Sequence, residues 1–284
     1  MVSYSCNYMP KTWNDLKLNF FILSLKKSLR RRRRIENNFS ENSISYHFID
    51  AVDGDDEAAT RNAYICDPSA APRIYVHRKR PVSLREIACT LSHMSAIRFA
   101  AEQELKNVII CEDDIEIGDV SASEIQEILD KIPSDAAYIQ FCIIPEKTVC
   151  RLADFYLETK RLFARKRKDS PTLFEENELS GLSCHSAAAY LITKSGIENI
   201  MKTYFRSEKV VFPCDTSEVE SNIGLAADRF IYQAASSESN PGYVYCIPTF
   251  LIEGVESLLH PDHVPDHLKA RKAAIKFRYL AKTK

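Results

Sequence analysis

Long apolar runs are absent from this sequence. No stretch approaches the roughly 18 apolar residues that a membrane-crossing helix requires. The first twenty residues also lack the charged start and the apolar stretch of a signal peptide. These absences predict a chain that is soluble, or that associates only peripherally with a membrane surface.

Paired cysteines are absent as well. The chain has nine cysteines, an odd number, and none of them forms a CxxC pair. Most lie inside apolar runs, as Cys111 and Cys142 do. This pattern favours reduced core thiols and a cytoplasmic protein over a disulfide framework or a zinc site.

The chain lacks a strong net charge and a phosphate-binding loop. Its net charge of −1 argues against a general nucleic-acid partner, and no G-x-x-x-x-G-K-[ST] motif is present. The charge is nevertheless uneven. Residues 30–34 are five consecutive arginines, and residues 269–284 carry seven Lys or Arg. These patches predict contacts with anionic ligands or lipid headgroups.

Apolar segments with strand and helix patterns alternate along the first half of the chain. Residues 19–25 and 44–49 read as strands, and residues 108–111 and 136–144 as buried strands. Helices are expected after Ser28, after Ser83 with Glu86 completing a capping box, and over residues 122–132. The βαβ rhythm predicts an α/β fold with a mainly parallel central sheet flanked by helices.

The same patterns suggest one main domain over residues 19–260, preceded by an N-terminal extension, residues 1–18. Residues 55–81 read as irregular, and residues 145–182 as an inserted loop or helical lobe. A strand over 187–193, a helix over 195–205 and a last strand over 243–251 complete the domain, with Pro248 marking the end or an edge of that strand. Residues 261–284 are expected to form a basic C-terminal helix.

Three acids end the strand of residues 108–111. In an extended segment Glu112 and Asp114 point to the same side, so the pair could hold Mg²⁺ or Mn²⁺ through oxygen and leave coordination positions for phosphate. The alternative is an acidic turn in water.

Several segments, in this order, resemble glycosyltransferase family 25 of lipopolysaccharide and lipooligosaccharide biosynthesis. They are FILSLKKSLRRRRRI, YHFIDAVDG, SLREIACTLSHMSAI, NVIICEDDIEI and AAAYLITKSGIENIM, followed by ADRFIYQ and YVYCIPTFL. The resemblance implies a GT-A-like fold, a nucleotide-sugar donor such as UDP-galactose or UDP-glucose, a metal at the acid motif, and inversion at the anomeric carbon. It also implies a glycan or glycolipid acceptor.

The resemblance carries roles onto particular residues. Glu112 and Asp114 become metal ligands, while Asp113 faces ribose or remains structural. One or two of the arginines, among Arg31, Arg33 and Arg34, would meet the donor diphosphate. The others would form a solvated basic face.

Three further residues are donor-site candidates. Asp53, in an Asp-Gly turn, could contact ribose or the base, or could simply be a turn aspartate. Glu86 and His93 lie seven residues apart on one helix face, where they could orient the donor sugar or support the acid motif. A purely structural role is the alternative for the histidine.

An inverting transferase also needs a base. Asp228 is the preferred candidate from its place before the last strand, and Asp215 is its rival. A surface ion pair is the alternative role for Asp228. His260 is a further candidate metal ligand in a tail that otherwise reads as a surface loop.

These expectations describe a metal-dependent hexosyltransferase that uses a UDP-sugar. A metal-dependent nucleotidyltransferase, or an inactive nucleotide-sugar-binding or glycan-binding relative, is the alternative. The C-terminal helix, with Leu268, Ile275 and Tyr279 among its apolar residues, could hold the enzyme on the anionic inner leaflet, on the cytoplasmic side. Packing of this helix on the domain is the alternative.

Overall fold

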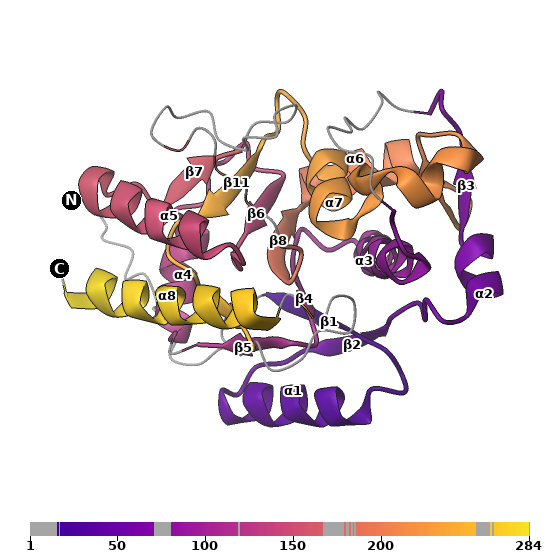
Figure 1. Cartoon of the computed structure of the whole chain (residues 1–284). Coiled ribbons are helices and arrows are strands. Elements are labelled where there is room, and N and C mark those ends of the chain that lie inside the picture. The colour runs from indigo at the N-terminus through magenta and orange to yellow at the C-terminus, as the bar shows by residue number, and fades with distance from the viewer. Residues whose placement is uncertain are drawn as a thin grey trace, which may run out of the picture.

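A seven-stranded sheet forms the centre of the protein (Figure 1). The structure is a computed structural model, which describes residues 16, 18–70, 81–118, 120–166, 179, 182, 184, 186–253, 262 and 264–283. The strands of the sheet are β1 (Asn19–Ser24), β2 (His47–Asp50), β4 (Asn107–Glu112), β6 (Tyr138–Gln140), β7 (Phe163–Arg165), β8 (Ala189–Thr193) and β11 (Gly242–Tyr245).

Most strands of this sheet run in one direction. Across the sheet the order is β2-β1-β4-β8-β6-β11-β7. β1 pairs in parallel with β2 and β4, and β6 pairs in parallel with β11. β8 is antiparallel to both β4 and β6, and β7 is antiparallel to β11. Five strands therefore share a direction, which confirms the predicted α/β fold with a mainly parallel sheet.

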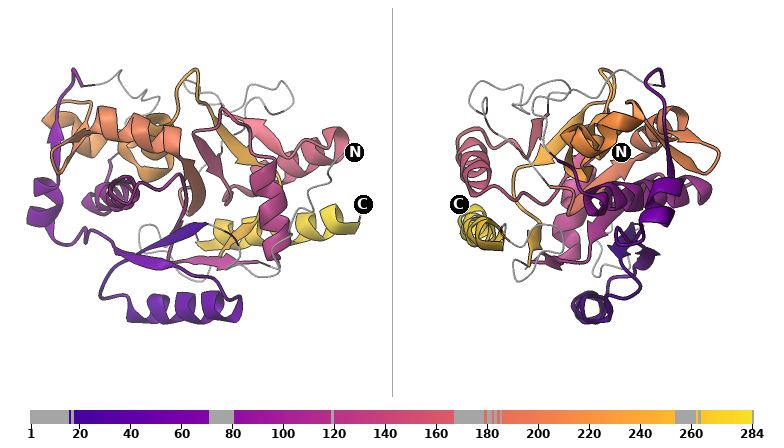
Figure 2. Two further views of the ribbon diagram at one scale, coloured as in Figure 1. Left: turned by 180° about the vertical axis from the view of Figure 1, so that it is seen from behind. Right: turned by 45° about the vertical axis from the view of Figure 1, so that its right-hand side comes forward.

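Helices cover both faces of the sheet, as the two further views in Figure 2 show. The alternation of side chains along β1 explains why: Phe21 and Leu23 join one core, while Phe20 and Ile22 join the other. The first core includes helices α3 (Leu84–Glu102), α6 (Lys194–Tyr204) and α7 (Ala227–Ala235). The second core includes helices α1 (Leu29–Glu41) and α4 (Ala122–Asp130).

The start of α3 is fixed by the predicted capping box. The backbone N–H of Ser83 donates to Glu86 Oε2 at 2.9 Å, and the N–H of Glu86 donates to Ser83 Oγ at 3.2 Å. The turn after β2 approaches this helix start closely. A Cβ at Gly54 would lie 2.5 Å from Cα of Arg85, so a larger residue would push the turn away. This glycine therefore keeps the Asp-Gly turn beside α3.

Some segments are more regular than the sequence suggests. Residues 55–70 contain α2 (Glu57–Asn62) and β3 (Tyr64–Cys66), and β3 pairs with a strand from much later in the chain. That distant partner explains why local patterns did not reveal the strand. Residues 71–80 lie outside the description. β3 belongs to a three-stranded sheet with β10 (Lys209–Phe212) and β9 (Phe205–Arg206).

The later segments also differ in detail. Within residues 145–182, β7 joins the main sheet, and residues 167–178 lie outside the description. The strand expected over 243–251 is interrupted around Pro248: β11 ends before it, and a second strand after it pairs with the segment that follows β4. The strand after Pro248 is β12 (Phe250–Ile252), and its partner is β5 (Ile115–Ile117). Residues 145–182 also contain the helix α5 (Glu146–Thr159).

The chain ends in helix α8 (Val264–Thr283), which lies beside α5 (Figures 1 and 2). Ala270, Ala274 and Phe277 are buried, so this helix packs on the domain along one face. None of the helices in the described part of the chain combines the length and hydrophobicity that a membrane crossing requires. Of the expected N-terminal extension, residues 1–15 and 17 lie outside the description.

Candidate active site

The carboxyl ends of three neighbouring parallel strands meet at one edge of the sheet. In the strand register, Ser24 at the end of β1 lies opposite Asp50 of β2, and Leu23 lies opposite Glu112 of β4. In open α/β sheets, ligands bind at such carboxyl ends. The register therefore brings the Asp-Gly turn after β2 and the acid motif after β4 to the same edge.

A cavity of about 820 Å³ opens at this edge. This is within the size range of small-molecule sites, roughly 300–1,000 Å³. Its wall combines the strand ends with the beginnings of α3, α5, α7 and α8. The polar lining residues include Lys27, Arg31, Asp53, Arg85, Glu86, Cys89, Glu112, Asp113, Asp114, Lys147, Asp228, Asp266, His267 and Lys269.

The acid motif forms a turn and not an extended strand. β4 ends at Glu112, and Asp113 and Asp114 make the turn into β5. The alternation argument for Glu112 and Asp114 therefore does not hold beyond the strand end. All three residues nevertheless line the cavity, because the turn lies at its wall.

Asp113 is held by residues of β1 and α1. Its carboxylate accepts hydrogen bonds from Ser24 Oγ at 2.6 Å and from Arg31 Nη1 at 2.7 Å. Its carbonyl oxygen accepts from Arg34 Nη2 at 2.8 Å. Of the two expected roles for Asp113, these contacts support the structural one.

Asp114 has the environment of an unsatisfied buried acid. Its side chain is 9% exposed, and its Oδ1 makes no hydrogen bond within the described residues. Burial first, and then the neighbouring Glu112 carboxylate, raise the pKa of Asp114 to about 8. A divalent cation would offset the cost of this buried charge, and oxygen ligands suit Mg²⁺ or Mn²⁺. Asp114 and Glu112 therefore fit the expected metal.

The arginine run separates into residues with different surroundings. Arg31 is buried at the cavity, while Arg33 is exposed and is not among the lining residues. Arg34 pairs with Glu253 as well as with the Asp113 carbonyl. Arg32 lies over the Phe48 ring at 4.8 Å. Arg31 is thus the expected diphosphate contact that the fold brings to the cavity.

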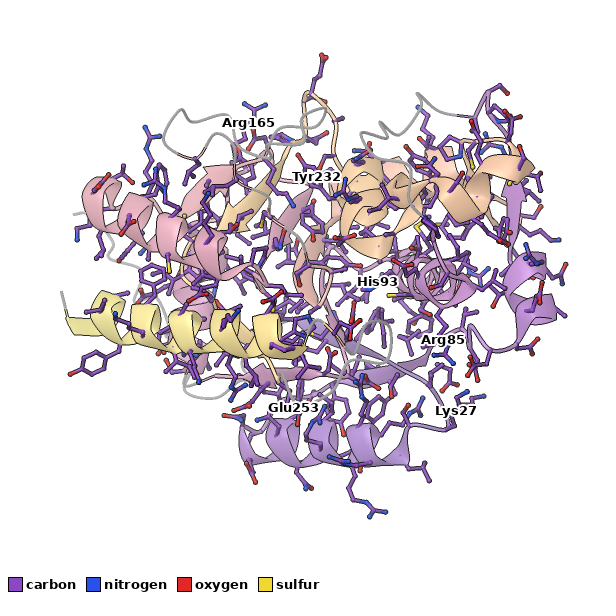
Figure 3. All side chains as sticks on the ribbon, viewed as in Figure 1. Lys27, Arg85, His93, Arg165, Tyr232 and Glu253 are labelled. Atoms are coloured by element: carbon purple, nitrogen blue, oxygen red, sulfur yellow. The ribbon has the colours of Figure 1, made fainter. Side chains whose placement is uncertain are left out.

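Charged residues also surround the Asp-Gly turn. Lys27 pairs with Asp53 at 2.5 Å and with Asp55 at 3.2 Å, and Arg85 pairs with Asp55 at 2.8 Å. The Lys27 ammonium lowers the pKa of Asp53. Figure 3 labels both cations. Lys27 lies in the segment between β1 and α1, and Arg85 lies in the first turn of α3. Asp53 is therefore at the cavity, and its charge is already partly neutralised.

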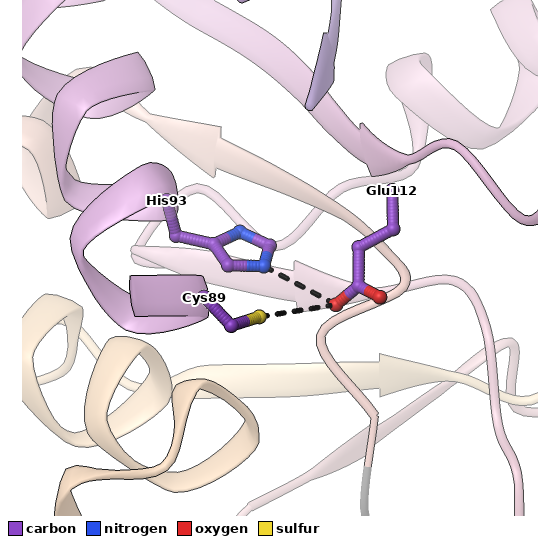
Figure 4. Close-up of side chains that lie close together, drawn as sticks. All are labelled: Cys89, His93 and Glu112. Carbon is purple, nitrogen blue, oxygen red and sulfur yellow. Dashed lines mark hydrogen bonds and ion pairs between the residues drawn. The ribbon is translucent and has the colours of Figure 1, made fainter. Parts of the chain in front are cut away.

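The helix residues expected near the donor sugar have distinct contacts. Glu86 lines the cavity and completes the capping box of α3. His93 is fully buried, with Nε2 3.3 Å from Glu112 Oε1 and Nδ1 3.0 Å from Tyr190 Oη. Cys89, one turn earlier, lies 3.9 Å from the same Glu112 oxygen (Figure 4). The histidine thus touches the acid motif directly.

The two candidate bases are placed differently. Asp228 lies in the first turn of α7 and lines the cavity. Asp215 is exposed, is not among the lining residues, and caps the 3₁₀ helix Thr216–Ser221 together with Glu218. The structure therefore places Asp228 in the same cavity as the acid motif and leaves Asp215 outside its lining.

Several lining residues were not identified from the sequence. Lys27, Arg85, Cys89 and His267 all face the cavity, and His267 is buried at the start of α8. Cys89 had a local signal, because it lies four residues before His93 on one helix face. His267 belongs to the histidine-containing tail of residues 259–267 that was expected to be a surface loop, whereas the structure places His267 in α8. His260, the expected ligand, lies outside the described residues.

Comparisons with known proteins identify the family of the chain. The sequence profile of Glycosyltransferase family 25 (LPS biosynthesis protein) matches residues 17–217. A candidate glycosyltransferase of Haemophilus influenzae is 32% identical over 108 residues, which are 38% of this chain and 36% of that protein. A "Glycosyltransferase 25 family member" of Aedes aegypti is 27% identical over 130 residues, 44% of this chain and 21% of that protein.

Other similarities are weaker or more partial. Human procollagen galactosyltransferase 2 is 26% identical over 149 residues, 47% of this chain and 23% of that protein. The matches thus span between about a fifth and about a third of these relatives' lengths. Among solved structures, mouse xyloside xylosyltransferase 1 has a TM-score of 0.37 and 10% identity, and the match covers 80% of this chain and 71% of that one. Because the family profile covers most of the sequence, including the arginine run and the acid motif, the chain belongs to glycosyltransferase family 25.

Proposed function

We propose that this protein is an inverting, metal-dependent glycosyltransferase. It would move a hexose, galactose or glucose, from a UDP-sugar to a glycan acceptor of the lipopolysaccharide or lipooligosaccharide type. The observation that supports this most directly is one cavity lined by Glu112, by Asp114, whose Oδ1 makes no hydrogen bond within the described residues, and by a separate acid, Asp228. Family membership supports glycosyl transfer as the chemistry.

The cavity offers contacts for the diphosphate and the ribose of the donor. Glu112 and Asp114 would hold Mn²⁺ or Mg²⁺, which would stabilise negative charge on the leaving diphosphate. Arg31 at the wall adds positive charge on the same side. Asp53 is placed to accept a hydrogen bond from a ribose hydroxyl. The mouth of the cavity also carries Lys27 and Arg85, which suit an anionic ligand.

Asp228 is the proposed base. It would accept the proton of the acceptor hydroxyl as that oxygen attacks the anomeric carbon and the nucleoside diphosphate leaves from the opposite side. Its position at the first turn of α7, on the cavity wall, gives it access to an acceptor. One displacement of this kind inverts the anomeric configuration.

The outer face of α8 suits a lipid-linked acceptor. Leu268, Ile275 and Tyr279 are exposed, and their spacing of seven and four residues places them on one side of the helix. Lys272 and Lys276 are exposed close to this side. An apolar stripe flanked by lysines fits an anionic membrane surface, so we include peripheral attachment to the inner leaflet in the proposal.

Donor hydrolysis tests the proposal without knowledge of the acceptor. Purified protein would be incubated with UDP-galactose or UDP-glucose and Mn²⁺, and the products would be resolved by chromatography. Release of UDP and free hexose that stops in excess chelator supports the transferase. Formation of hexose 1-phosphate and UTP when pyrophosphate is added would support a nucleotidyltransferase instead. Binding of the nucleotide sugar without turnover, even with candidate acceptors present, would indicate a non-catalytic relative.

A further inference from the structure

Cys89, His93 and Glu112 converge at the junction of α3 and β4. The cysteine and histidine lie four residues apart on one face of α3, and the glutamate ends the adjacent strand β4. One potential ligand atom from each residue lies within 4.8 Å of the other two. Figure 4 shows the three side chains pointing toward one another. These residues approach one another through the fold, and the sequence predicted no zinc site because it has no CxxC pair.

The spacing of these atoms is close to that of a tetrahedral zinc site. Zn–S bonds of about 2.3 Å and Zn–N or Zn–O bonds of about 2.0–2.1 Å place neighbouring ligand atoms about 3.3–3.6 Å apart. Here His93 Nε2 is 3.3 Å from Glu112 Oε1, and Cys89 Sγ is 3.9 Å from the same oxygen. The third pair, Cys89 and His93, has its ligand atoms within 4.8 Å, so side-chain movement that brings this pair closer would complete the geometry.

The residues around the trio also suit a metal. His93 Nδ1 lies 3.0 Å from Tyr190 Oη, and a partner on the second ring nitrogen is what orients most histidine ligands. The tyrosine hydroxyl can either donate to this nitrogen or accept from it, so it fits the imidazole with and without a metal on Nε2. His93 is therefore already oriented toward the ligand position.

We propose that Cys89, His93 and Glu112 form a binding site for Zn²⁺, with a fourth coordination position open to the cavity. A site with one thiolate, one imidazole and one carboxylate prefers a borderline-soft cation such as Zn²⁺, whereas Mg²⁺ and Mn²⁺ prefer oxygen ligands alone. Cys89 and Glu112 line the cavity while His93 is buried behind them. An open position therefore faces a water molecule or a ligand oxygen. Binding replaces the thiol proton of Cys89, which passes to solvent.

This site is distinct from the cation proposed at Asp114. Glu112 directs Oε1 at Cys89 and His93, and its second oxygen takes no part in these two contacts. The zinc proposal does not require transferase activity, since it rests only on the three side chains. A failure of the zinc proposal can therefore be distinguished from a failure of the proposed transferase function.

Cobalt provides the test, because a Co²⁺–thiolate bond gives a charge-transfer absorption band. The full chain, freed of metal by dialysis against chelator, would be titrated with Co²⁺ and then with Zn²⁺. We expect the band to saturate at one equivalent and to vanish as Zn²⁺ displaces the cobalt. Cys89→Ser should abolish the band and weaken Zn²⁺ binding, measured by calorimetry, by at least ~10-fold. Cys150→Ser, which changes an exposed thiol of α5, is the matched control and should behave as the parent.

Two further variants complete the test. Asp114→Asn should keep the cobalt band. If this variant lost the band, Asp114 would belong to the same metal site, and the proposal of a separate zinc site would be overturned. His93→Gln should also lose the band, with His47→Gln, at an exposed histidine of β2, as its control. Because His93 is fully buried, that variant counts only if its circular dichroism matches the parent. A parent chain without a band, or an equal band in Cys89→Ser, would overturn the proposal.

Discussion

Arg31 and Asp113, 82 residues apart in the sequence, form a buried ion pair with a nitrogen–oxygen distance of 2.7 Å. Each side chain is 7% exposed. The pair ties α1 to the turn that follows β4, and so it fixes the position of the neighbouring Asp114 at the cavity wall. Arg31 also lies 3.8 Å from the Asp114 carboxylate. Arg31 therefore supports the acid motif as well as lining the cavity.

Arg31→Gln should destabilise the protein strongly. Removing one member of a buried ion pair leaves the other charge uncompensated, at a cost of about 3–5 kcal/mol. Arg33→Gln is the matched control, because Arg33 is exposed in the same helix, and it should change the free energy of unfolding by less than ~0.5 kcal/mol. Urea denaturation followed by circular dichroism measures both. The double variant Arg31→Gln/Asp113→Asn should recover part of the loss, and equal stabilities for the two single variants would contradict this role of Arg31.

Asp114→Asn should abolish Mn²⁺-dependent hydrolysis of a UDP-hexose while the protein stays folded. The amide has nearly the same shape as the carboxylate, but it is a poorer ligand for a hard cation. Asp154→Asn, at an exposed position of α5, should retain parental activity. Initial rates with Mn²⁺, and again with excess chelator, provide the measurement. Full activity of the parent in chelator would exclude a metal at this acid.

The same residue predicts a pH dependence of stability in the metal-free protein. The pKa of Asp114 is about 8 in the folded chain, against about 3.9 when unfolded, so the folded state keeps a proton that the unfolded state has lost. The stabilisation of the folded state by this proton is fully present below about pH 4. It decreases as the pH rises above that value and is lost once the pH has passed through about 8. In Asp114→Asn this loss should be absent, which makes the variant more stable than the parent at pH 8 by on the order of a few kcal/mol. Denaturant titrations at pH 5 and pH 8 measure the free energy of unfolding of both proteins. The same change between the two pH values in the parent and in the variant would contradict the prediction.

Asp228→Asn should lower kcat and leave donor binding in place. A general base contributes about 10²- to 10⁴-fold to the rate, and the amide cannot accept the proton of the acceptor hydroxyl. Asp215→Asn should be close to parental, because Asp215 is exposed and caps a 3₁₀ helix. Transfer kinetics give kcat, and calorimetry with a non-hydrolysable donor gives binding. If the effects were reversed between the two variants, Asp215 would be the base.

Charge reversal on α8 should weaken attachment to membranes. Lys272→Glu/Lys276→Glu removes two exposed cations beside the stripe of Leu268, Ile275 and Tyr279, and each cation near an anionic surface contributes about 1 kcal/mol. The control reverses two exposed lysines elsewhere, Lys106→Glu/Lys202→Glu, and so has the same net charge. Sedimentation with anionic vesicles at low salt should separate the two pairs. An equal loss of vesicle binding in both double variants would show that the attraction depends on the overall charge of the protein and not on α8.

Local sequence patterns were sufficient for much of the secondary structure. The capping box of Ser83 and Glu86 and the buried strand before Glu112 appear where predicted, because each depends on neighbours a few residues away. The strand β3 and the helix α7 were not predicted. β3 has only three residues, whereas α7 does have a helical pattern in the sequence, because its buried residues Ala227, Phe230, Ile231, Ala234 and Ala235 follow helical spacing. β3 exists through its pairing with β10, a contact that no short window of sequence contains.

The sequence by itself determined which chemical groups are available: a strand that ends in three acids, a helix that begins with arginines, and a cysteine four residues before a histidine. Only the tertiary structure decided how these groups are used. The sheet register brings the ends of β1, β2 and β4 together, so Asp113 is bound by Arg31, while Asp114 Oδ1 has no hydrogen-bond partner in the described part of the chain. The packing of α3 against β4 likewise brings Cys89 and His93 to Glu112. Partners for buried charges are chosen by contacts between distant segments, and these arise only when the chain folds.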